Sequence, residues 1–97
     1  MDNRDYLVML YDYYSELFND RQKLYFEEYY FNNLSLGEIS DNLGVSRNAI
    51  HKCIIGMEEK LKFYEEKLGL FYKTNIIRDI IKKESDDKLK KQLEELI

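Results

Sequence analysis

Proline is absent from this 97-residue chain, and only four glycines, one cysteine and one histidine are present. The chain therefore has few of the residues that interrupt a helix. A single cysteine excludes an intrachain disulfide, and one cysteine with one histidine falls short of a structural zinc site. No phosphate-binding glycine loop, nucleophile constellation or paired carboxylate site is visible. The sequence predicts helices joined by short turns in a protein that is not an enzyme and needs no cofactor.

Long apolar runs are also missing. The first ten residues, MDNRDYLVML, contain two aspartates, so they predict neither a secretory signal nor a membrane span. We expect a cytoplasmic protein that does not insert into membranes. A chain of this length forms one domain with at most an appended arm, and its small core often gains stability from pairing with a second copy.

Negative charge is concentrated at the N-terminal end. The net charge is −4, and residues 1–34 carry seven acids and three bases, whereas residues 35–57 carry two of each and residues 58–97 ten of each. A neutral middle segment permits contact with phosphate without requiring it. The acidic end could instead offer a basic protein partner a surface formed by Asp12, Glu16, Asp20, Glu27 and Glu28.

Apolar residues at helical spacing and capping residues divide the first two thirds of the chain into four helices. The first helix is predicted at about 4–18. Asn19 with Gln22 resembles a capping pair that opens a helix at about 20–31. Ser35 with Glu38 forms a clearer capping box before a short helix at 36–42. A fourth helix is predicted from 47 to about 68.

The turn between the third and fourth helices carries the pattern of a helix-turn-helix. Gly44 can adopt the left-handed conformation that ends a helix, and Ser46 can cap the next one. Ser40 is small where the two helices would approach each other. The positions that should point into the shared core are apolar: Ile39, Leu43, Val45, Ile50 and Cys53.

The same spacing leaves a polar face on the fourth helix. Arginine can pair with guanine and asparagine with adenine, whereas lysine and serine suit phosphates. Nucleic acid, either DNA or RNA, is therefore a candidate partner. The alternative is a solvated helix surface on a protein-binding module, because only two of these residues are cations and Glu38 and Asp41 offset them. The candidate contact residues are Ser46, Arg47, Asn48, His51 and Lys52.

Nine tyrosines are the most numerous aromatic residues. Their helical spacing favours positions at the margin of the core with exposed hydroxyls over a role in stacking bases. His51 has no partner at ligand spacing and is interpreted as a solvent-facing side chain. Cys53 is interpreted as a small core residue.

The tail carries two narrow apolar stripes, Ile76/Ile77/Ile80/Ile81 and Leu89/Leu93/Leu96. Helices this short are marginal alone, so we expect residues 73–97 to dock on the body or on a second copy, and we favour a homodimer. Residues 85–87 could either cap a separate last helix or continue the previous one. Basic tail residues could also fold beside the fourth helix: Lys82, Lys83, Lys90 and Lys91.

The stretch from Leu17 to Leu68 resembles region four of bacterial sigma factors. The longer stretch from Asp5 to Phe71, with LSLGEIS, the turn GVSR and the segment YEEKL, is more similar still to the YlxM-like family of small bacterial helix-turn-helix proteins. The second resemblance implies a regulatory or accessory role in the signal recognition particle pathway, with components of that particle as partners. It names no ligand.

The sequence therefore predicts an all-α protein, a small helical bundle containing a helix-turn-helix with a C-terminal helical extension. The helix-turn-helix domain is expected at 1–72 and the helical arm at 73–97. The leading hypothesis is a regulatory protein that binds nucleic acid, and the alternative is a protein-interaction adaptor in which the helix-turn-helix serves only as scaffold.

Overall fold

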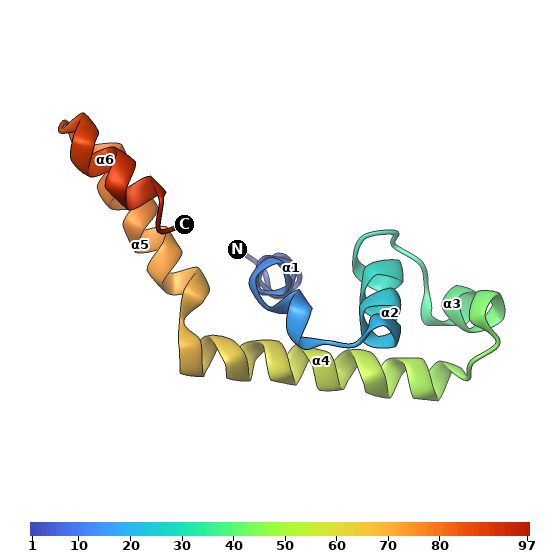
Figure 1. The fold of residues 1–97 in the computed structure, drawn as a ribbon. Coiled ribbons are helices and arrows are strands. Elements are labelled where there is room, and N and C mark those ends of the chain that lie inside the picture. Colours follow the sequence, from blue (N-terminus) through green and yellow to red (C-terminus); the bar gives the residue numbers. More distant parts are fainter.

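The computed structural model describes all 97 residues and contains helices and turns only, which confirms the predicted all-α class (Figure 1). Residues 15–17 form a short 3-10 turn, η1 (Ser15–Leu17). The α-helices are α1 (Asn3–Tyr14), α2 (Asp20–Tyr30), α3 (Leu36–Leu43), α4 (Arg47–Leu68), α5 (Leu70–Lys83) and α6 (Asp87–Glu94).

The long helix α4 organises the fold. Helices α1, α2 and α3 all lie on one side of it and follow one another along its length (Figure 1). Four residues of α4 that recur at helical spacing are at most 2% exposed: Ile50, Ile54, Met57 and Leu61. A single apolar stripe on α4 thus holds three helices, and its opposite side stays free of them.

Three buried tyrosines tie the helices of this bundle together. Each hydroxyl donates a hydrogen bond to a glutamate on another helix, so that α1 is joined to α2, α1 to α4, and α2 to α4. The sequence had suggested exposed hydroxyls, and for these three tyrosines that prediction is wrong. Each hydroxyl is instead paired inside the bundle, because a buried hydroxyl without a hydrogen-bond partner is costly. The pairs are Tyr11 with Glu27 (2.7 Å), Tyr14 with Glu65 (2.6 Å) and Tyr30 with Glu58.

The predicted capping pairs are confirmed. Asn19 with Gln22 and Ser35 with Glu38 each form a reciprocal capping box at the start of α2 and α3. The predicted end of the first helix at residue 18 is wrong. Helix α1 ends at Tyr14 and the chain passes through η1, so that Phe18 turns into the core while Leu17 stays exposed.

One predicted core residue of the helix-turn-helix is also misplaced. Ile39 and Ile50 are fully buried, and Val45 and Cys53 are half-buried against the core. Leu43, in contrast, is 37% exposed. Leu43 is the last residue of α3, and α3 lies at one end of the molecule (Figure 1).

The C-terminal arm, α5 and α6, begins at a tightly hydrogen-bonded junction. Gly69 ends α4 with a φ of 63°, a left-handed conformation that glycine adopts without steric cost. The Glu65 carboxylate accepts from the backbone N–H groups of Phe71 (3.1 Å) and Tyr72 (3.0 Å), and the Tyr14 hydroxyl accepts from that of Leu70 (3.1 Å). These bonds cap α5 and fix its direction.

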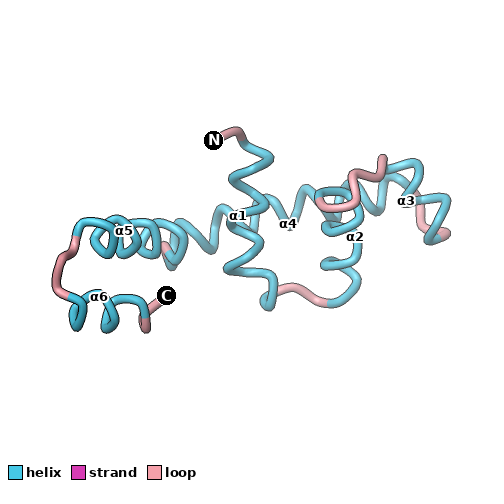
Figure 2. The backbone as a smooth tube through the Cα atoms, turned by 90° about the horizontal axis from the view of Figure 1, so that it is seen from above, coloured by secondary structure: helices cyan, strands magenta, loops and turns pink.

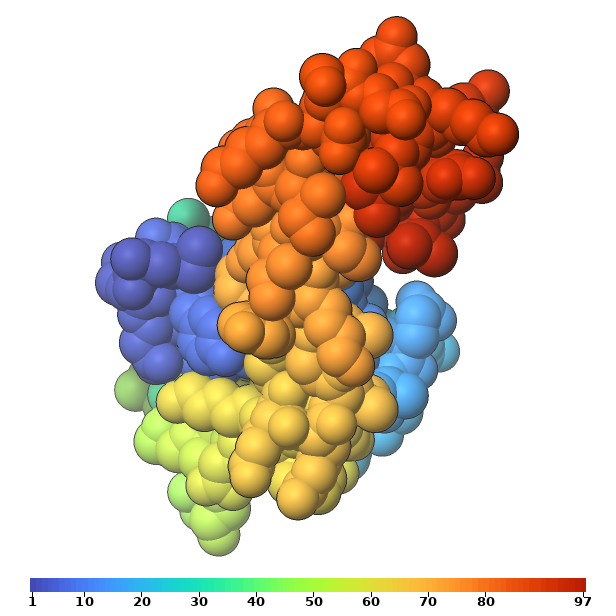
Figure 3. Space-filling view, turned by 90° about the vertical axis from the view of Figure 1, so that its left-hand side faces the viewer, coloured from blue at the N-terminus to red at the C-terminus, as the bar shows by residue number.

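Beyond this junction the arm projects from the body. Helix α6 turns back along α5 after a break at residues 84–86, where Asp86 caps α6, so the tail holds two helices and not one (Figure 2). Only the start of α5 lies against α1. The space-filling view shows the rest of the arm standing clear (Figure 3). The arm and the start of α4 lie at opposite ends of the molecule, so the tail lysines do not fold beside α4's first turns (Figure 1).

Candidate nucleic-acid interface

The turn between α3 and α4 has the geometry that the sequence predicts. Gly44 adopts a φ of 67°, and Ser46 caps α4 by accepting a hydrogen bond from the Ala49 N–H at 3.1 Å. The hydroxyl proton of Ser46 is not used by this bond and remains available to an acceptor. The first two turns of α4 lie at one end of the molecule, which we call its tip (Figure 1).

The five predicted contact residues lie together at this tip. Ser46, Arg47, Asn48, His51 and Lys52 are all exposed. Ile50 stands between them and is fully buried, so it fixes which side of α4 faces the core and leaves the polar residues outside. We refer to these five residues as the α4 tip face.

Arg47 is exposed, but its side chain bends back along the surface and does not extend straight out from this face. Its guanidinium lies against the first turn of α3, beside Gly37. A methyl group at Gly37 would stand 2.7 Å from Arg47 Nη2 and 2.9 Å from Cζ, closer than carbon atoms approach in proteins. Gly37 therefore makes room for Arg47. The sequence contains one sign of this contact: Gly37 lies inside a capped helix, where no turn requires a glycine.

The charges of the α4 tip face are not neutralised by ion pairs. The one salt bridge of the chain joins Lys23 to Glu16, at 3.5 Å, on α2 and η1. Glu38, on α3, accepts a hydrogen bond from the Ser35 N–H at 3.0 Å, and this bond together with the Ser35 hydroxyl lowers the pKa of its carboxyl. The surface beside the α4 tip face thus contains both free cations and a firmly ionised glutamate.

Two further cations act on Cys53 of α4, one from α2 and one from α4 itself. Burial raises the pKa of the Cys53 thiol, while the positive charges of Arg21 and Lys60 act in the opposite direction, so both cations lie near this residue. Arg21 comes from the start of α2, and only the packing of α2 on α4 brings it here. Sequence patterns within single helices could not reveal that Arg21 and Lys60 both lie near Cys53.

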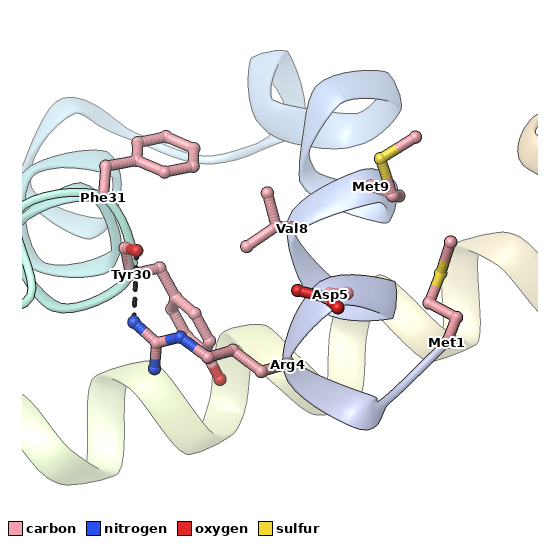
Figure 4. A pocket seen from close by; sticks show the side chains of 7 residues that line it. All are labelled: Met1, Arg4, Asp5, Val8, Met9, Tyr30 and Phe31. Atoms are coloured by element: carbon pink, nitrogen blue, oxygen red, sulfur yellow. Dashed lines mark hydrogen bonds between the residues drawn. The ribbon is translucent and has the colours of Figure 1, made fainter.

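A groove lies between α1 and the end of α2 (Figure 4). Its volume is about 470 Å³. Arg4 crosses one side of it and donates hydrogen bonds to the backbone carbonyls of Tyr29 and Tyr30, both at 3.1 Å, where α2 ends. Its guanidinium is therefore already engaged. The lining residues are Met1, Arg4, Asp5, Val8, Met9, Tyr30 and Phe31.

Two other kinds of site find no support in the structure. No group of three or more histidine, cysteine, aspartate or glutamate side chains is placed to hold a metal ion. None of the helices combines the length and apolar character needed to cross a membrane.

Comparison with known proteins identifies the family. A family model described as "UPF0122: Putative helix-turn-helix protein, YlxM / p13 like" matches residues 1–97. A UPF0122 protein of Caldanaerobacter subterraneus is 47% identical over 68 residues, which cover 70% of this chain and 58% of the relative. One of Thermoanaerobacter sp. is 40% identical over 89 residues, covering 92% and 72%. One of Listeria monocytogenes is 40% identical over 97 residues, covering 91% and 88%.

The chain thus spans just over half the length of the first of these relatives and most of the length of the last. The match extends through the helix-turn-helix, the part of the chain on which the resemblance to YlxM-like proteins rested, and it confirms that resemblance. The chain belongs to the UPF0122 family of YlxM/p13-like helix-turn-helix proteins.

Proposed function

We propose that this chain is a cytoplasmic regulatory protein that binds DNA or RNA through the α4 tip face and acts as a homodimer. The observation that supports the nucleic-acid role is the helix-turn-helix itself, whose second helix presents polar, unpaired side chains at the tip of the molecule. Proteins with this motif place the start of the second helix in the major groove. Its family is described in the same structural terms.

The residues divide by the contacts that their chemistry permits. Asn48 and Arg47 can pair with base edges, and for Arg47 this requires the guanidinium to leave Gly37. Lys52 and the free hydroxyl proton of Ser46 suit phosphate oxygens. Because this face has only two cations, Arg47 and Lys52, we expect it to bind nucleic acid of random sequence weakly and in a salt-sensitive way, with a dissociation constant of about 10⁻⁴ to 10⁻⁶ M.

A salt titration tests the proposal. We expect the affinity for a labelled random-sequence duplex to fall as salt rises, and the slope of log K against log salt to become shallower by about 0.9 for each phosphate contact removed. The Arg47→Ala, Lys52→Ala double variant should therefore bind more weakly and with a shallower slope. Fluorescence anisotropy with duplex DNA and single-stranded RNA would measure both.

The matched control is the Lys82→Ala, Lys91→Ala double variant, which removes the same charge from exposed positions on the arm. It should bind like the parent chain. Equal loss in both double variants would show that only total charge matters, and parental binding by the Arg47→Ala, Lys52→Ala variant would exclude the α4 tip face.

The groove supports a second candidate function, a protein-interaction adaptor. Apolar and thioether side chains line it, and Met-rich surfaces accommodate varied partners. Helix α1, which forms one wall of the groove, also carries Asp5 and Asp12, so a basic partner is favoured. A component of the signal recognition particle, the pathway implied by the family resemblance, would be such a partner. Capture of that component after nuclease treatment, lost in a Met9→Glu variant, would favour this function over nucleic-acid binding.

A further inference from the structure

One side of α5 is left uncovered. Phe71 and Thr74 lie toward α1, where the Phe71 ring packs edge-on against that of Tyr6 with centroids 5.8 Å apart. On the opposite side three large residues follow at intervals of one helical turn. These residues, which we name the α5 stripe, are Tyr72, Ile76 and Ile80, exposed to 65%, 41% and 44%.

The molecule exposes more surface than a compact monomer of its mass. A monomer of 11.8 kDa is expected to expose about 5,900 Å². This chain exposes 6704 Å², and its extents of 55 × 24 × 24 Å reflect the projecting arm. The excess of about 800 Å² is close to the area that one partner buries in an interface of standard size.

The charges of the arm favour a second copy over a strongly charged partner. Residues 70–97 carry seven bases and six acids, so no excess of one sign selects a nucleic acid or a basic protein. The arm has further exposed apolar residues, namely Leu89 in α6 and Leu96 and Ile97 beyond its end.

The stripe is also complementary to itself. Lys73 and Asp79 each lie three residues from Ile76, one before it and one after it, on opposite flanks of the stripe. In an antiparallel pair centred on Ile76, each Tyr72 meets Ile80 of the second copy, and the apolar side chains of one stripe face those of the other along its whole length. A parallel pair would instead bring Tyr72 opposite Tyr72 and Ile80 opposite Ile80.

We propose that two copies of this chain pair through their α5 stripes, antiparallel, with the two-fold axis passing at Ile76. Such an interface is isologous: each copy contributes the same patch. The proposal rests on the proposed homodimer and specifies its interface. It requires no nucleic acid, so it can fail while binding by the α4 tip face holds, and the reverse.

An oligomer measurement tests which surface pairs. The full-length parent should have a mass of twice 11.8 kDa by light scattering at micromolar concentration. Ile76→Glu places a charge on the two-fold axis and should give the monomer mass. Ile55→Glu is the matched control, because Ile55 is 40% exposed on the side of α4 that carries no helix. It should remain dimeric, and both variants should keep the parental helix signal in circular dichroism.

Disulfide trapping tests the register. In a Cys53→Ser background, oxidised Ile76→Cys should cross-link, because helices in contact at the axis bring the two Cα atoms within bridging distance. Ile80→Cys alone should not, since the two copies of this position are about 12 Å apart along the helices. A mixture of the Tyr72→Cys and Ile80→Cys chains should cross-link to each other.

Three outcomes would overturn the proposal. A monomeric parent chain would assign the stripe to a different kind of partner. A dimer that survives Ile76→Glu would place the interface elsewhere. Equal cross-linking of Ile76→Cys and Ile80→Cys would show a parallel pair.

Discussion

At the scale of single residues, the two glycines inside helices have different explanations. Gly37 leaves room for the Arg47 guanidinium, and a larger residue there must displace it. Gly56, in the middle of α4, has no atom within 4 Å of the position that a methyl group would occupy, and its φ is negative. Glycine in a helix interior is entropically unfavourable relative to alanine, so Gly56 weakens α4 without an evident packing reason.

Gly56→Ala should therefore increase the free energy of unfolding by about 0.5–1 kcal/mol. Urea denaturation followed by circular dichroism would measure the change against the parent chain. Gly37→Ala provides the comparison, because there the exposed Arg47 guanidinium must also move to make room for the methyl group. A loss of stability in Gly56→Ala would mean that another surface covers this side of α4.

The roles of individual residues were predictable where they depend on neighbours in the chain. Gly44, Ser46 and the exposure of Lys52 follow from the short pattern of a helix-turn-helix, and the structure has them as expected. The position of the Arg47 side chain and the tyrosine hydroxyls depend on residues far away in the sequence. They could not be deduced without knowing how the helices pack.

At the scale of elements, helix starts were well predicted because caps are local. The end of α1 was not, since α1 stops where Phe18 must turn into a core built by other helices. The break at residues 84–86 resolves an ambiguity that the sequence left open: the Glu84 carboxylate accepts from the backbone N–H groups of Ser85 and Asp86 and stabilises a turn.

The tyrosine bonds between helices predict alkaline instability. Burial and the hydrogen bond to Glu65 raise the pKa of Tyr14 from 10.0 to about 12, and burial also raises the pKa values of Tyr11 and Tyr30. When folding raises the pKa of a tyrosine, the stabilisation is complete at pH values below the pKa of the unfolded chain. It is lost progressively as the pH rises from that value through the pKa of the folded chain. Stability should thus be constant up to about pH 10 and fall toward pH 12.

Thermal unfolding followed by circular dichroism across this pH range would measure the effect. Tyr14→Phe should cost about 1–3 kcal/mol at neutral pH, because Glu65 and the Leu70 N–H lose a partner, and should flatten part of the alkaline decline. An unchanged pH dependence in this variant would show that the α1 to α4 bond contributes little.

At the scale of the whole molecule, the core belongs entirely to the body. The thirteen buried apolar residues fall between Leu7 and Leu61, and none comes from α5 or α6. The arm is joined to the body by the Glu65 junction and by the packing of Phe71 near Tyr6 and Tyr13. The body should therefore not depend on the arm for its fold.

A chain truncated after Tyr72 should consequently stay helical and unfold cooperatively, and it should be monomeric because it lacks Ile76 and Ile80. Thermal denaturation by circular dichroism and light scattering would measure the two properties. A truncated chain that is unfolded would show that the arm supports the body, and a truncated dimer would place the interface within residues 1–72.

Helix α4 connects the two surfaces to which we assign functions, the α4 tip face at its start and the arm at its end. With 22 residues it is about 33 Å long, and each residue turns the chain by about 100°. Inserting one residue into α4 would therefore rotate the tip face relative to the dimer axis by about 100°, which is more than a quarter turn. The length of α4 thus sets the angle between the directions in which the two tip faces of a dimer point. It thereby determines the spacing of the two half-sites on a nucleic acid that both tip faces can contact at once.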